Sequence, residues 1–116
     1  MDKDIEERIT QLGNVSISPK VAGMLSTRDI DLLLARHVLG DFGDVGMDEM
    51  KANDLAMYQR IGTVKSEFET ERGTVYIITR FNQPVTVVAY GVEVMDDAEV
   101  YDGMVPNVSD DADSMV

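Results

Sequence analysis

The only histidine of this chain stands among residue types that can do chemistry together. His37 is followed by Asp41 and Asp44 within the glycine-rich stretch ARHVLGDFGDV, residues 35–45. An aspartate four residues after a histidine can meet it across the last turn of a helix and orient the ring for general acid–base catalysis. Alternatively, the histidine packs in the core, the glycines supply positive φ, and the aspartates accept bonds from loop N–H groups. The sequence leaves both interpretations open.

Polar residues on the predicted strands form a second candidate group. Hydroxyl and guanidinium groups on neighbouring strands can converge on one phosphate, although threonine is also an ordinary strand residue and a strand-end arginine can simply guard an edge. An asparagine in the middle of a helix is locally costly unless its side chain is used. The candidate catalytic residues are therefore His37, Asp41, Asn53 and Ser66, and the candidate binding residues are Asp41, Asp44, Arg80 and Thr86.

Neither a metal nor another cofactor is expected. The chain has no cysteine, which excludes disulfides and thiolate metal sites. The acidic residues after His37 have the odd spacing of a calcium loop, but Gly43 and Gly46 fall where such a loop needs ligands. No phosphate-binding loop and no dinucleotide fingerprint occurs.

The elements that must position these residues change character along the chain. The first half has apolar residues at helical spacing, and in its most regular helix His37 shares one stripe with Ile30, Leu34 and Val38. The last third alternates with a period of two and has short turns, as strands do. The predicted helices are 3–11, 20–25, 28–39 and 48–59, and the predicted strands are 62–70, 74–80 and 85–90, with an extended segment at 14–18.

The helix over 48–59 carries a further expectation about the core. Met50, Leu55 and Met57 are its candidate inward residues, and Met47 just before it is expected to fill a core gap.

Helices followed by a meander predict an α+β fold. We expect the N-terminal helices to pack on one face of a C-terminal, three- to four-stranded antiparallel meander, in a single domain over residues 1–96. From Asp96 onward the chain has seven acidic residues and no Lys or Arg. Residues 97–116 are therefore predicted to be an acidic, disordered tail.

The charge limits the partners. The formal net charge is -12 and the pI is about 4.2, which disfavours direct binding to nucleic acid or to an anionic membrane and favours a basic protein partner. The N-terminus shows no secretory signal, and no apolar run is long enough to span a bilayer, so a cytoplasmic location is expected.

Several stretches resemble a family of small uncharacterised proteins found on plasmids, integrative elements and phages. The motif Arg-His-x-x-Gly-Asp-Trp-Gly-Asp of that family is matched by residues 36–44, with Phe42 in place of Trp. Asn53, Ser66 and residues 76–79 match further positions, so that the resemblance covers residues 12–90. The chain departs from the family at Thr63, where an arginine is usual, and at 80–84, where the family has Glu-Ala-Asp-Arg-Ser.

Three functions are compatible with these observations. The first is an accessory protein of a phage or mobile element that binds a basic host protein, for example in counter-defence; it is favoured by the acidity and by the departures from the family. The second is a small ribonuclease-like or phosphoryl-transfer enzyme with His37 as acid or base and Ser66 and Thr86 orienting phosphate. The third is a structural virion component. The oligomeric state stays open.

Overall fold

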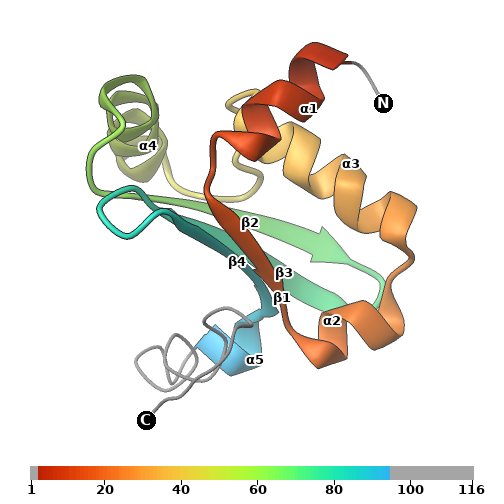
Figure 1. Ribbon diagram of the computed structural model, residues 1–116. Coiled ribbons are helices and arrows are strands. Elements are labelled where there is room, and N and C mark those ends of the chain that lie inside the picture. The colour runs from red at the N-terminus through yellow and green to blue at the C-terminus, as the bar shows by residue number, and fades with distance from the viewer. Residues whose placement is uncertain (1–2, 95–116) are drawn as a thin grey trace, which may run out of the picture.

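The computed structural model describes residues 3–94, in which most helices precede most strands (Figure 1). The helices are α1 (Lys3–Thr10), α2 (Pro19–Met24), α3 (Thr27–Val38), α4 (Met47–Gln59) and α5 (Gly91–Val94). The strands are β1 (Asn14–Ile17), β2 (Thr63–Thr70), β3 (Gly73–Arg80) and β4 (Val85–Tyr90). The predicted α+β class is confirmed, whereas the predicted tail over 97–116 lies outside the described residues. Among the described helices, none is both long and apolar enough to cross a membrane.

Local signals explain where α2 and α3 begin and where α3 ends. The Ser18 hydroxyl accepts a hydrogen bond from the Val21 N–H at 3.1 Å, and the Ser26 hydroxyl accepts one from the Asp29 N–H at 3.0 Å. These N-caps satisfy backbone donors that the first helical turn leaves free. Gly40, with φ +87°, follows the end of α3 in the left-handed conformation that favours glycine.

The sheet is mixed, with the strand order β1-β4-β3-β2. The chain-consecutive strands β2, β3 and β4 pair antiparallel, but β1 pairs parallel with β4. The prediction of a purely antiparallel meander is therefore wrong for the sheet as a whole. The physical reason lies in β4, which is buried at all six positions. The backbone N–H and C=O groups of such a buried strand need hydrogen-bond partners along both edges, and the segment at 14–17 supplies them on the edge away from β3.

The main core lies between the sheet and the first three helices. Val21 of α2 and Ile30 and Leu34 of α3 pack against strand residues that include Ile77 and Val88. α1 packs on α3, whereas α4 stands apart from both and contacts β2 (Figure 1). The junction between α3 and α4 therefore meets the sheet at its β2 edge, and the candidate residues on this side include Asp41, Asp44, Asn53 and Ser66.

Candidate functional site

His37 is enclosed where the end of α3 meets the sheet. Its side chain is 0 % exposed. Nδ1 lies 2.6 Å from the Ser66 hydroxyl oxygen, and Nε2 lies 2.9 Å from that of Thr79. The Phe42 ring stands edge-on to the imidazole, with 6.2 Å between the ring centroids. Both ring nitrogens therefore have a partner inside the protein.

The direction of these hydrogen bonds follows from where they end. The Thr86 hydroxyl donates to the carbonyl oxygen of Leu12 at 3.1 Å, and a carbonyl can only accept. The hydroxyl oxygens of Thr79 and Thr86 are 2.7 Å apart, so Thr79 donates to Thr86. Thr79 must then accept from the Nε2–H of His37, which leaves Nδ1 to accept from Ser66. The neutral Nε2–H tautomer of His37 is the one that fits.

This chain of hydrogen bonds joins separate elements of the fold. It ties α3 to β2, β3, β4 and the segment before β1, and it ends at a carbonyl that cannot take up a proton. Burial lowers the pKa of His37 from 6.5 to about 4, so the ring is neutral at pH 7. Since no side of the imidazole faces solvent, a substrate has no route to it in this structure.

Asp41 is held by an arginine and not by the histidine. Arg36 donates to its carboxylate twice, from Nε to Oδ2 at 2.8 Å and from Nη2 to Oδ1 at 3.3 Å. Oδ1 also accepts the N–H of Gly43 at 3.2 Å. The hydrogen bond from Arg36, the largest effect, holds the pKa of Asp41 below its usual value. The Arg36 guanidinium lies 4.4 Å from the ring centroid of Phe68, so the pair is seated on the core.

The loop after α3 and one side chain of α4 close the free edge of β2. The Asn53 side chain donates to the Lys65 carbonyl at 2.8 Å and accepts the Lys65 N–H at 3.1 Å. Two residues farther along, the Glu67 N–H donates to Phe42 and the Asp44 N–H donates to the Glu67 carbonyl, at 2.9 and 2.8 Å. These contacts satisfy backbone groups that an edge strand otherwise presents to solvent or to other chains.

Gly43 shows why the motif needs a glycine at this place. Its φ is +74°, and a Cβ built on it would lie 2.1 Å from the Glu67 carbonyl oxygen. No side chain fits that separation without moving β2 or the loop. The glycine therefore permits the close approach that the edge contacts require.

The second candidate group does not form one site. Ser66 and Thr86 are linked by hydrogen bonds through His37 and Thr79, but each of these residues is 0 % exposed. Arg80 follows Thr79 in β3, and successive strand residues point to opposite faces of a sheet. The side chain of Arg80 therefore leaves the sheet on the other face from that of Thr79.

The surface of α4 is the feature that sequence reasoning missed. Asn53, Ala56 and Met57 face the body of the protein, whereas Leu55 is 57 % and Tyr58 87 % exposed. The expectation that Met47, Met50 and Leu55 are core residues is wrong. The hydrogen bonds of Asn53 to β2 turn the side of the helix that carries Asn53 toward the sheet, so that these three residues face away from it. We call the exposed side the outer face of α4; it consists of Met47, Met50, Lys51, Asp54, Leu55 and Tyr58. The sequence indicated this face only through a second group of apolar residues on the same helix, in addition to those that face the sheet.

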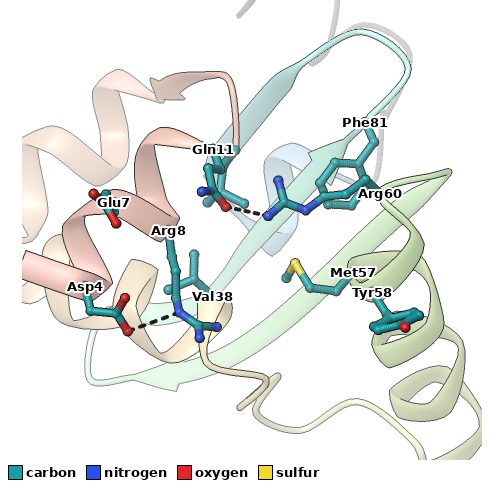
Figure 2. A pocket seen from close by; sticks show the side chains of 10 residues that line it. Asp4, Glu7, Arg8, Gln11, Val38, Met57, Tyr58, Arg60 and Phe81 are labelled. Atoms are coloured by element: carbon teal, nitrogen blue, oxygen red, sulfur yellow. Dashed lines mark hydrogen bonds and ion pairs between the residues drawn. The ribbon is translucent and has the colours of Figure 1, made fainter.

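A groove of about 420 Å³ lies between α1 and the C-terminal end of α4. Figure 2 shows Met57 inside it and a hydrogen bond from Arg60 to Gln11 across its mouth. Asp4 and Arg8 form an ion pair on the α1 side (Figure 2). None of the predicted site residues lines this groove.

Comparisons with protein-family models, with curated proteins and with solved structures gave no match for this chain. Within residues 3–94, no group of three or more histidine, aspartate or glutamate side chains is placed to hold a metal ion.

Proposed function

We propose that this protein acts by binding a basic protein and not by catalysis. The observation that carries the proposal is the enclosure of His37, the only histidine, which is 0 % exposed and has both ring nitrogens bonded. An acid–base catalyst must reach the proton that it transfers. The ribonuclease-like alternative has no comparable support from the geometry.

Charge supports the choice of partner. The net charge of -12 attracts basic surfaces and repels nucleic acid. Asp41 and Asp44, both expected to bind, are exposed at the loop between α3 and α4. Asp41 is already paired with Arg36, whereas the backbone N–H of Asp44 is bound to β2 and its carboxylate lies at the surface. Together with the resemblance to mobile-element proteins, this supports an accessory protein that meets a host protein in the cytoplasm.

The test is capture of host proteins by the full chain at low and high salt. We expect a basic protein to be retained at low salt and to be released as screening increases. Asp44→Lys should weaken that capture, whereas Glu71→Lys, the same charge change at the exposed β2–β3 turn, should leave most of it. If expression of the protein instead kills the cells, and a His37 variant that still folds does not, the protein would be an enzyme.

A further inference from the structure

α4 has apolar residues on two opposite sides. The inner side is anchored, because Asn53 is bonded to β2, and Ala56 and Met57 pack around Val64 and its neighbours. On the outer face, Met47 is 67 %, Leu55 57 % and Tyr58 87 % exposed. A surface helix normally has one apolar side, and a second one that stays in solvent marks a contact surface.

The outer face has the spacing of a helix-pairing seam. Met47, Lys51, Asp54 and Tyr58 follow one another at intervals of four, three and four residues, which places them along one line of an α-helix. Met50 and Leu55 flank this line on its two sides. The line thus has an apolar residue at each end and two opposite charges at its centre.

We propose that the outer face of α4 binds the same face of a second copy of this chain, with the two helices antiparallel about a two-fold axis. In one register, Met47 lies opposite Tyr58 of the second copy, and Lys51 lies opposite Asp54 of the second copy. The axis repeats each contact, so that two sulfur–aromatic contacts and two opposite-charge contacts form. The flanking Met50 and Leu55 side chains cover the sides of the seam.

Charge complementarity identifies the occupant as a second copy. The centre of the face has one positive and one negative side chain, and in the antiparallel register each meets the other sign. A basic partner of the kind proposed above would place positive charge against Lys51. The dimer contact is therefore a different surface from the acidic one, and it leaves Asp44 outside the line that pairs.

The size of the seam sets the expected affinity. The facing side chains of a helix of 13 residues bury less than the roughly 1,200 Å² of a small specific interface. The repulsion between two chains of charge -12 lowers the affinity further. We expect dissociation constants on the order of 10–100 µM, within the range of sedimentation equilibrium.

The experiment is sedimentation equilibrium of the full chain and of charge-reversal variants. Lys51→Asp or Asp54→Lys places like charges opposite each other twice, and each variant should weaken association at least about tenfold. Combining both changes in one chain restores opposite signs and should restore the dimer. Mixing the two single variants should produce a heterodimer for the same reason. Lys20→Asp, an equal charge change at an exposed position of α2, is the matched control and should leave association nearly unchanged.

Three results would overturn the proposal. The first is a chain that stays monomeric at concentrations several times the expected dissociation constant. The second is a dimer that Lys20→Asp weakens as much as Lys51→Asp does. The third is a dimer that does not form again when the two single variants are mixed. The three positions changed, Lys51, Asp54 and Lys20, are all exposed, so circular dichroism and thermal unfolding should confirm that each variant is folded.

Discussion

The motif over residues 36–44 and the outer face of α4 adjoin in sequence but use their side chains in opposite ways. In the motif, two residues of types associated with catalysis have partners within the protein: His37 bonds two hydroxyls, and Asp41 pairs with Arg36, whereas the carboxylate of Asp44 is left at the surface. On the outer face of α4, residue types typical of a core lie in solvent. A functional surface is therefore better recognised by groups that the fold leaves accessible than by residue type alone.

If the motif is architectural, its most constrained residue should give the largest loss of stability. Gly43→Ala places a Cβ 2.1 Å from the Glu67 carbonyl oxygen and also imposes φ +74° on an alanine. We expect a loss of about 4 kcal/mol in the free energy of unfolding, measured with urea. Gly62→Ala is the matched control, because Gly62 also has positive φ but has nothing within 4 Å of the built Cβ. Its loss should be about 1 kcal/mol, and equal losses for both variants would contradict the close-approach explanation.

The pH dependence of stability tests the enclosure of His37. Its pKa is about 4 in the folded protein against 6.5 ordinarily, so the unfolded chain takes up the proton first. Stability is therefore complete above about pH 6.5 and falls as the pH drops toward 4, by about 3 kcal/mol in total. Urea unfolding between about pH 7.5 and pH 4.5 measures this loss. The single imidazole NMR signal should not titrate above about pH 5, and titration near 6.5 would show that the ring is accessible.

The fold was largely predictable because its signals are local. Apolar spacing and capping residues placed α3, and two-residue alternation placed β2, β3 and β4 within one or two residues of their observed bounds. The pairing of β1 with β4 was not predicted, because nothing in the sequence of Asn14–Ile17 indicates that it pairs with a strand 71 residues later along the chain. This pairing depends on contacts between residues far apart in the sequence.

The site was predictable in its members but not in their arrangement. The sequence singled out His37 and Ser66, which do meet, and Asn53, whose costly place in a helix reflects its bonds to Lys65. It did not determine that His37 is sealed, because a histidine on an apolar stripe can face either a core or a cleft. Nor did it determine the orientation of α4, where two apolar sets compete and a polar residue, Asn53, decides which one faces inward.

The closure of the β2 edge can be tested with an isosteric change. Asn53→Asp keeps an acceptor for the Lys65 N–H but removes the donor and sets a carboxylate against the Lys65 carbonyl. We expect the free energy of unfolding, measured with urea, to fall by about 2 kcal/mol. Self-association of the folded protein should not change. Gln59→Glu, the same chemical change at an exposed position of α4, should cost less than about 0.5 kcal/mol. If Asn53→Asp cost no more than this control, Asn53 would not hold α4 against β2.

The smallest effect is expected at the exposed ion pair of Arg36 and Asp41. The two side chains are 47 % and 53 % exposed, so water screens the ion pair. Arg36→Lys loses the two-point contact and the stacking on Phe68, and should cost less than about 1 kcal/mol. A double-mutant cycle with Asp41→Asn measures the coupling energy directly. A coupling energy above about 2 kcal/mol would show that the ion pair is essential to the structure of the motif. A small coupling energy would mean that the buried hydrogen bonds of His37 and the close approach of Gly43 to β2 stabilise the motif instead.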